Sequence, residues 1–484
     1  MIDCHDVCVE SAGQRPSYEE LAELVALQAR TIERLTARIA ELEVEVAELR
    51  RRLGSNSTNS SRPPSSDGLA KPRREPGRSS GRRKGKQPGS PGSTLMTVAN
   101  PDHVVVHRPQ RCANAACGAD LADAAEYARQ RRQVFELPEP RMTVTEHQVV
   151  ALSCGCGQVT MAEAPGGVTG RVQYGPTVKA AAVYARGAQF LPFGRAARLL
   201  GDLCGAPVST GFVHGVFTDA AACLQPFLHR VRDLLRVAPV LHADETPARL
   251  GGAFRYVHVA CTDELTLFHV AGRSAADIDA GGVLPGFAGT IVRDGYAAYA
   301  HLTDAEHAWC GAHLLRDLKG VHESDPGGQT WAEAMANTLL IAKRMTEQAV
   351  AAGRNKLTDE QISFIRSCYA GAIAAGRAEN PPDRNGELSR AGKLVERFHT
   401  HHGMILRFVL DLAVPFTNNS AERALRPVKL QQKISATWRI LQGLADFAAV
   451  RSYLDTAAKH GIDAFTVLKQ LFTTDPWMPP TLSG

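Results

Sequence analysis

Two stretches, VLHADETPARL at 240–250 and TIVRDGYAAY at 290–299, decide the fold of the central part of the chain. Each begins with a short apolar run typical of a buried strand and then reaches a carboxylate, Asp244 in the first and Asp294 in the second. We therefore expect both aspartates at the C-terminal ends of strands, at a sheet edge or crevice. Between them, FRYVHVACT and LTLFHVAG flank a short acidic turn, which predicts a hairpin. Strands followed by helices indicate an α/β domain that begins at residue 237.

Two carboxylates brought side by side repel each other, and a divalent cation resolves that repulsion. Oxygen ligands select Mg²⁺ or Mn²⁺ rather than Zn²⁺. A third carboxylate is needed to hold two cations, and Glu422 in TNNSAERALRP is the best candidate. It lies early in a predicted helix that Asn419 or Ser420 would cap. The alternative is that strand-end acids cap loops and that Glu422 only complements the helix dipole.

A basic stripe follows Glu422. Arg426, Lys429 and Lys433 lie 4, 3 and 4 residues further on and would share one helix face with it, unless Pro427 ends the helix. A carboxylate beside such a stripe suits a metal site that binds a phosphodiester backbone.

The chain has 484 residues, which is too long for one core, so several domains are expected. Residues 1–53 contain a heptad pattern that predicts a parallel two-stranded coiled coil and hence a homodimer. The alternative is an amphipathic helix packed on its own chain. The a positions are Val25, Ile32, Ile39, Val46 and Leu53, and the d positions are Leu21, Gln28, Leu35, Leu42 and Leu49.

Residues 54–97 have the composition of a linker, rich in Ser, Pro, Gly and Arg and poor in apolar side chains, so disorder is expected. Within 54–92, nine Lys and Arg against two acids leave a surplus of seven positive charges. The segment is either a solvated linker or an arm that contacts DNA phosphates, with Arg82, Arg83 and Lys84 as the candidate contacts.

Residues 98–170 carry two short cysteine pairs, Cys112 with Cys117 and Cys154 with Cys156. The segment between the pairs reads as two strands around a Pro-rich turn, which would give a zinc-ribbon-like domain with four thiolates on one Zn²⁺. Four free thiols are the alternative, and His103, His107 and His147 are spare ligands.

Helices are expected on both sides of the strand region. Residues 171–236 form a predicted helical domain in which AARLLGDLCGAPVSTGFVHGVF has helix-turn-helix punctuation, with Ser209 or Thr210 as the cap. Any two-helix hairpin has a similar pattern. Residues 331–410 are an Ala-rich helical insertion. It would separate the first part of the catalytic domain, 237–330, from the second part and the C-terminal helices, 411–484.

Composition excludes two classes of protein. No stretch of about 18 residues lacks charge, so no membrane span is expected. The acidic N-terminus lacks the basic and apolar regions of a secretory signal. With eleven scattered cysteines and no such signal, thiols or metal ligands are expected rather than disulfides, in a cytoplasmic, nucleoid-associated protein.

A family resemblance joins these segments. The chain resembles the insertion sequence 66 family of bacterial transposases, an acidic-triad group, in LHADETPARL, IVRDGYAAY, CGAHLLRDL and NNSAERALRPVKLQQKIS. The zipper, the SSRPPSS linker, the cysteine ribbon and QYGPTVKAAAVY are also similar and keep the family's order. Thr417 and Pro247 depart from residues common in that family, and neither is a triad position.

The resemblance implies a multidomain α/β protein with an RNase H-like catalytic domain. That domain would contain the helical insertion and follow the coiled coil, the zinc-ribbon-like module and the helical domain. Asp244, Asp294 and Glu422 would be the catalytic triad that holds Mg²⁺ or Mn²⁺. Cys310 and His313 match a Cys-x2-His element, for which a local structural role is expected rather than a metal site.

The implied function is a DNA transposase that cleaves 3′ ends of an insertion sequence and performs strand transfer. Its partners would be transposon ends, target DNA and accessory proteins of the same element. Two other functions fit parts of the pattern: a catalytically inactive DNA-binding regulator derived from a transposase, and a structure-selective RNase H-like nuclease.

Overall fold

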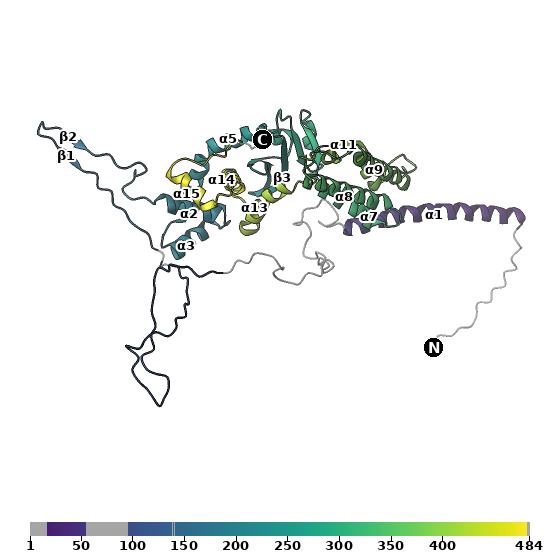
Figure 1. The fold of residues 1–484 in the computed structure, drawn as a ribbon. Helices are drawn as coiled ribbons and strands as arrows, with labels where there is room; N and C mark the ends of the chain where they lie inside the picture. The colour runs from purple at the N-terminus through teal and green to yellow at the C-terminus, as the bar shows by residue number, and fades with distance from the viewer. Residues whose placement is uncertain (1–16, 55–94, 138, 140, 482–484) are drawn as a thin grey trace, which may run out of the picture. The chain divides into compact units, whose positions relative to one another are not determined.

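The computed structural model describes residues 17–54, 95–137, 139 and 141–481, and it has a mixed α/β fold with a helical majority (Figure 1). Two compact units contain these residues. The first comprises the described parts of 1–71 together with 174–193 and 213–484, and the second comprises those of 72–173 together with 194–212. Each unit is described by itself. Among the described residues, none of the helices combines the length and apolar character needed to cross a lipid bilayer.

A five-stranded mixed sheet in the order β5-β4-β3-β6-β7 organises the first unit. The strands are β3 (Val240–Leu250), β4 (Ala253–Cys261), β5 (Thr266–Ala271), β6 (Thr290–Arg293) and β7 (Glu306–Trp309). The first three pair antiparallel, whereas β3, β6 and β7 pair parallel. The hairpin predicted over β4 and β5 is present, and a second one joins β3 to β4. Gly251 and Gly252 make that tight turn with φ of +54° and +92°, which favour glycine.

Strand β3 is longer than its sequence suggests. It pairs with β6 only over Val240–His242 but continues beside β4 to Leu250. The prediction that Asp244 ends a strand is therefore wrong, because the antiparallel partner extends β3 beyond the carboxylates. Asp294 does follow directly after the end of β6.

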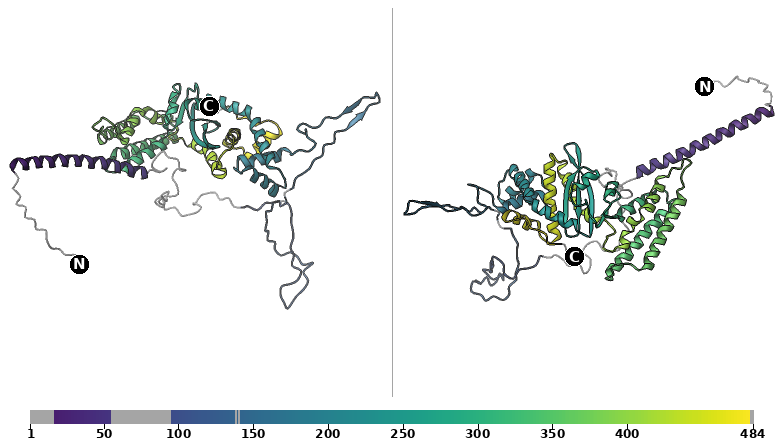
Figure 2. Two further views of the ribbon diagram at one scale, coloured as in Figure 1. Left: turned by 180° about the vertical axis from the view of Figure 1, so that it is seen from behind. Right: turned by 90° about the horizontal axis from the view of Figure 1, so that it is seen from above.

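Helices cover the β5 side of the sheet (Figure 2). Helix α14 (Leu441–Lys459) packs on β5, and its hydroxyls bond the backbone of this edge strand. Ser452 Oγ accepts from the N–H of Phe268 at 2.9 Å, and Thr456 Oγ1 accepts from the N–H of Thr266 at 3.0 Å. These bonds satisfy donors that an edge strand would otherwise leave unpaired. The other helices of this region are α2 (Pro176–Gly187), α4 (Thr210–Cys223), α5 (Gln225–Arg236), α13 (Asn419–Ser435) and α15 (Ala464–Thr473).

Residues 331–410, expected to be a helical insertion, fall in helices whose apolar core continues from the β6–β7 side of the sheet. Buried Val292 and Trp309 belong to the same core as Trp331 and Phe398. Helix α9 starts with a capping box in which Thr358 and Gln361 bond each other's backbone N–H groups. Helix α7 (Gly311–Ser324) precedes this range. The helices of the range are α8 (Thr330–Ala351), α9 (Asp359–Glu379), α10 (Arg390–Thr400), α11 (His402–Ile405) and α12 (Arg407–Leu410).

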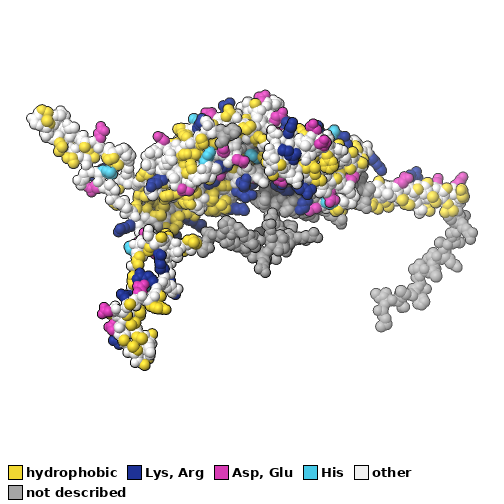
Figure 3. Space-filling view, in the orientation of Figure 1, with side chains coloured by type: hydrophobic (Ala, Val, Ile, Leu, Met, Phe, Trp, Pro, Cys, Tyr) yellow, Lys and Arg dark blue, Asp and Glu magenta, His cyan; other side chains and the backbone are white. Residues whose placement is uncertain are grey.

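Helix α1 (Tyr18–Gly54) occupies the predicted coiled-coil segment, and its described apolar side chains are exposed. Ile32 is 63% exposed, Leu35 55% and Ile39 57%, and hydrophobic side chains run along the helix in Figure 3. This exposure leaves an apolar stripe without a partner among the residues that the structure describes.

Apart from helix α3 (Phe193–Cys204), the second unit has little regular structure. Its strands β1 (Ala151–Ser153) and β2 (Val159–Met161) pair around the turn that carries Cys154 and Cys156. The two strands expected between the cysteine pairs are not formed in the described residues of 131–150. Their side chains are almost all exposed, so little buried apolar surface stabilises strand pairing.

The helix cap predicted at Ser209 is present at the start of α4, since Ser209 Oγ accepts from the N–H of Phe212 at 3.0 Å.

Candidate active site

Asp244 and Asp294 come from neighbouring parallel strands. His242 of β3 is paired with Val292 of β6; Asp244 lies two residues further along β3, and Asp294 is the residue directly after β6. Because β3 and β6 run parallel, both aspartates lie just beyond the paired residues at the same end of this pairing. Backbone N–H groups orient both: Asp244 Oδ1 accepts from the N–H of Glu245 at 2.8 Å, and Asp294 Oδ1 accepts from that of Tyr296 at 2.9 Å.

The electrostatics of Asp244 reflect this proximity. Burial, followed by the negative charges of Glu245 and Asp294, raises the pKa of Asp244 from 3.8 to about 8. Lys429 of α13 and the Glu245 N–H act in the opposite direction, but they do not compensate. Asp244 is thus a half-buried carboxyl group that resists ionisation next to a second carboxyl group. A divalent cation between them would stabilise the charged form of Asp244.

Arg293 holds the turn that carries Asp294. Its buried guanidinium donates to the carbonyl oxygens of Asp294 and Tyr296 at 2.9 and 3.1 Å. It also donates to His307 Nδ1 at 2.9 Å, so the ring nitrogen Nε2 of His307 carries the proton and donates to the carbonyl of Leu302 at 3.0 Å. Burial lowers the pKa of Arg293.

Glu245, next to Asp244, is bound on the opposite face of β3. Its side chain is 2% exposed, and Arg273 contacts it at 2.9 Å. The hydroxyl of Tyr299 donates to its other oxygen at 3.0 Å. This pairing satisfies the second carboxylate of the ADET motif, so Asp244 alone faces Asp294.

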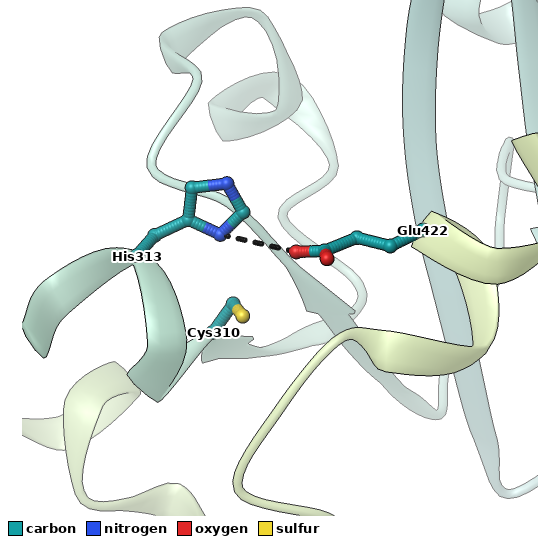
Figure 4. A group of neighbouring side chains, drawn as sticks. All are labelled: Cys310, His313 and Glu422. Atoms are coloured by element: carbon teal, nitrogen blue, oxygen red, sulfur yellow. Dashed lines mark ion pairs between the residues drawn. The ribbon is translucent and has the colours of Figure 1, made fainter. Parts of the chain in front are cut away.

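Glu422 lies in the first turn of α13 and faces the start of α7. Its Oε1 atom is 3.7 Å from His313 Nδ1 and 3.7 Å from Arg316 Nη2 (Figure 4). Both Glu422 Oε1 and His313 Nδ1 are buried and lack a hydrogen-bond partner. Burial and Arg316 lower the pKa of His313, whereas the charges of Glu422 and Asp294 act in the opposite direction. His313 therefore lies within electrostatic reach of both Glu422 and Asp294.

Cys310 completes this group. One ligand atom from each of Cys310, His313 and Glu422 lies within 4.8 Å of the other two. Among the described residues, no other set of three or more His, Cys, Asp or Glu side chains is this close. Burial raises the pKa of the Cys310 thiol. The sequence indicated only a local role for Cys310 and His313, and the structure places both beside Glu422.

Asn418 is the N-cap of α13, in place of the expected Asn419 or Ser420. Its side chain does not cap the helix. Instead, Nδ2 donates to the carbonyl of Ala243 at 2.8 Å, and Oδ1 lies 2.9 Å from His242 Nδ1. Its backbone N–H donates to Cys310 Sγ at 3.2 Å. One buried residue therefore joins β3 through its side chain and the start of α7 through its backbone, and it begins α13; these three elements carry Asp244, His313 and Glu422.

The basic stripe lies on α13. The helix continues through Pro427 to Ser435, and Arg426, Lys429 and Lys433 are exposed along it. Lys and Arg side chains gather near this helix in Figure 3. The other predicted DNA contacts, Arg82, Arg83 and Lys84, lie outside the described residues.

The four ribbon cysteines lie in two separate turns. Cys112 and Cys117 flank one turn, in which the N–H of Cys112 donates to the carbonyl of Ala119 at 2.9 Å. Hydrogen bonds from Cys156 lower the pKa of Cys154 in the other. The structure does not bring the two turns into one close group. The Zn²⁺ site at these residues therefore stays a prediction.

Several residues position the site although the sequence gives no signal of that role. The Asn-Asn pair before SAER marks the start of α13, but nothing in its letters shows that Asn418 reaches β3. Arg273 lies in a turn segment outside every quoted motif. Asn418, Arg293 and Arg316 do lie in segments already singled out, but the motif letters assigned them no role.

An α/β sheet with two adjacent carboxylates, a third acid on a following helix and a basic helical stripe defines a nucleic-acid-processing type of site. The model of the Transposase IS66 family matches residues 171–446, more than half of the chain, so the protein belongs to this transposase family. All three acids lie in the matched range. The resemblance seen in the sequence is thus confirmed, and the family implies a role on DNA.

Two further similarities are less informative. A Family of unknown function (DUF6444) matches residues 13–95, which include α1 and the basic segment. The Uncharacterized protein y4qI of Sinorhizobium fredii is 29% identical over 206 residues, 39% of this chain. The chain spans 36% of the length of that relative, little more than a third.

Proposed function

We propose that this protein is a DNA transposase that uses an RNase H-like domain to cleave 3′ ends of an insertion sequence and to join them to target DNA. The observation that carries the proposal is that Asp244 on β3 and Asp294, directly after the parallel strand β6, lie close enough for the charge of Asp294 to raise the pKa of Asp244, in a chain of the IS66 family. The strand order, with β3 at the centre between antiparallel and parallel partners, supports an RNase H-like domain.

The donor set fits Mg²⁺ or Mn²⁺. Asp244 and Asp294 offer hard oxygen ligands, and Glu422 would add one carboxylate oxygen after its helix approaches the aspartates, because the three acids do not yet lie in one group within 4.8 Å. Such a cation would lower the pKa of an attacking water and stabilise a leaving 3′ oxygen. Asp244 must lose its proton to act as a ligand, so its raised pKa makes cation binding favourable as the pH approaches 8.

The side chains around the acids would orient DNA. Lys429 lies close enough to Asp244 to influence its pKa, so a phosphate held by Lys429 would lie near the carboxylates. Arg426 and Lys433 extend the same exposed face, and Arg82, Arg83 and Lys84 would add backbone contacts from the arm. Such contacts predict DNA binding that weakens steeply with salt.

The other parts of the chain would arrange two DNA ends. The exposed stripe of α1 would pair with a second copy in a parallel coiled coil, so that one dimer binds two ends. The cysteine module, with Zn²⁺ on Cys112, Cys117, Cys154 and Cys156, would be a structural domain. The second unit and the helices of 171–236 would contribute DNA contacts, and accessory proteins of the same element would be further partners.

The test is cleavage of DNA that carries the ends flanking the gene, with purified protein and Mg²⁺. Wild-type protein is expected to nick the ends and join them to a target, whereas Asp244→Asn retains end binding and loses both reactions. End binding without any nicking would identify a catalytically inactive regulator, and cutting of branched DNA without joining would identify a structure-selective nuclease. Full cleavage by D244N would contradict the role of Asp244.

A further inference from the structure

A second kind of donor set lies next to the carboxylates. Cys310 is the N-cap of α7 and His313 is in the first turn of that helix, so the Cys-x2-His spacing puts thiol and imidazole on one side. Glu422 approaches from the first turn of α13. Figure 4 shows the three side chains converging from these two helices.

The imidazole and carboxylate donors have the spacing of two ligands in a tetrahedral site, and the thiol lies nearby. Zn²⁺ binds sulfur at about 2.3 Å and nitrogen or oxygen at about 2.0–2.2 Å, so its ligand atoms lie about 3.3–3.7 Å apart. His313 Nδ1 and Glu422 Oε1 are 3.7 Å apart, too far for a hydrogen bond, and the three donor atoms all lie within 4.8 Å. A small rotation of the side chains would bring all three into coordination distance.

The donor atoms also need a partner. Glu422 Oε1 and His313 Nδ1 are buried and make no hydrogen bond. Leaving buried polar atoms unpaired is costly, and a cation between them would satisfy both. The N–H of Asn418 donates a hydrogen bond to Cys310 Sγ at 3.2 Å. In metal sites, hydrogen bonds of this kind orient a ligand that contacts the metal.

We propose that Cys310, His313 and Glu422 form a mononuclear site for Zn²⁺ or a similar borderline transition-metal ion, separate from the magnesium site of the aspartates. Sulfur and imidazole donors select such ions over Mg²⁺. Three protein ligands leave a fourth position for water or a substrate oxygen. The site goes beyond the proposed function but shares Glu422 with it, one carboxylate oxygen being enough for each cation.

Arg316 is the charged group that opposes cation binding. Its Nη2 is 3.7 Å from Glu422 Oε1, but the side chain is 29% exposed and can turn to water. Asp317, on the same helix, is paired with Arg397 at 2.6 Å and so does not enter the group. The ligands therefore offer two negative charges, once the thiol is ionised, against one displaceable guanidinium.

The experiment uses Co²⁺ as a spectroscopic probe, because thiolate–cobalt charge transfer reports a cysteine ligand. The four ribbon cysteines are first replaced by serine in the full-length protein, which removes their contribution. This background protein is expected to bind one equivalent of Co²⁺ with a thiolate band that excess Mg²⁺ does not displace. Cys310→Ser is expected to abolish the band, and His313→Asn is expected to weaken Co²⁺ binding at least tenfold.

Matched controls are Cys368→Ser in α9 and His322→Asn in α7, which leave the group intact and are expected to retain the band. His313 is partly exposed, so H313N tests the site even if C310S fails to fold, as judged by circular dichroism. The proposal is overturned if the background protein shows no thiolate band or if the band and affinity survive H313N. Asp244→Asn separates the two sites, since it should lose Mg²⁺-dependent cleavage and keep the cobalt band.

Discussion

Asn418 Oδ1 lies 2.9 Å from Nδ1 of His242, although 176 residues separate the two along the chain. Both side chains are buried, with Asn418 1% and His242 6% exposed. Burial lowers the pKa of His242, so a neutral ring meets the amide. The contact fixes the start of α13 against the strand that carries Asp244, and it thereby sets the distance between Glu422 and the aspartates.

Removing this side chain should loosen the site. Asn418→Ala leaves the Ala243 carbonyl and His242 Nδ1 without their partner, at a cost of about 1–3 kcal/mol in the free energy of unfolding. We expect a lower thermal midpoint and a loss of end cleavage. Asn419→Ala, at the exposed neighbouring position, is the control and should change neither. Equal effects of N418A and N419A would show that the bridge does not position α13.

The pH dependence of stability should reveal Asp244. Its pKa is about 8 in the folded protein against an ordinary value of 3.8, so the unfolded chain loses this proton at lower pH than the folded one. The contribution of Asp244 therefore favours unfolding increasingly as the pH rises from about 4 to about 8. In metal-free buffer, D244N should have the higher thermal midpoint, with a difference that grows over this range.

The complementary measurement adds Mg²⁺ at pH 8, where it should raise the midpoint of the wild-type protein but not that of D244N. A difference between the two proteins that is the same at pH 4 and pH 8 would contradict the raised pKa of Asp244. The Mg²⁺ result would be contradicted by equal stabilisation of both.

Gly311 should tolerate no side chain. An added Cβ would lie 2.1–2.5 Å from atoms of the Phe416 ring, at the point where the Gly311 N–H donates to the Phe416 carbonyl at 2.8 Å. Gly311→Ala should displace the start of α7 and cost about 1–3 kcal/mol, with a lower thermal midpoint and reduced cleavage.

Gly371→Ala is the matched control for that change. Gly371 lies within α9, and a Cβ there would meet nothing within 4 Å. Because alanine is a better helix former than glycine, G371A should stabilise by about 0.5–1 kcal/mol. A thermal midpoint that falls as much for G371A as for G311A would rule out the Phe416 contact as the cause.

The apolar stripe of α1 should mediate dimer formation. Ile39 is 57% exposed and belongs to the a positions, so Ile39→Glu would place a charge in the seam of a coiled coil. We expect the variant to sediment as a monomer and to lose paired-end complexes more than single-end binding. Ala37→Glu, on the outer face of the same helix, should remain dimeric. A dimeric I39E would exclude this helix as the interface.

Local pattern was enough for several features of this chain. The heptads predicted α1, the apolar runs predicted β4, β5 and β6, and the motifs identified the family, because each depends on residues close together in sequence. The length of β3 was not predictable, since pairing with β4 rather than its own composition carries it to Leu250. The strands predicted in 131–150 are not formed for a related reason. No other part of the described chain packs against these residues to bury their apolar side chains.

The sequence by itself determined which acids were candidates and which strands would carry the two aspartates. Only the tertiary structure decided their surroundings: that Glu245 is bound by Arg273, that Asn418 joins three elements, and that Cys310 and His313 meet Glu422. The physical reason is that a pattern records which face of an element is apolar, whereas a side chain's partner depends on how distant elements pack, and packing is set by the whole core.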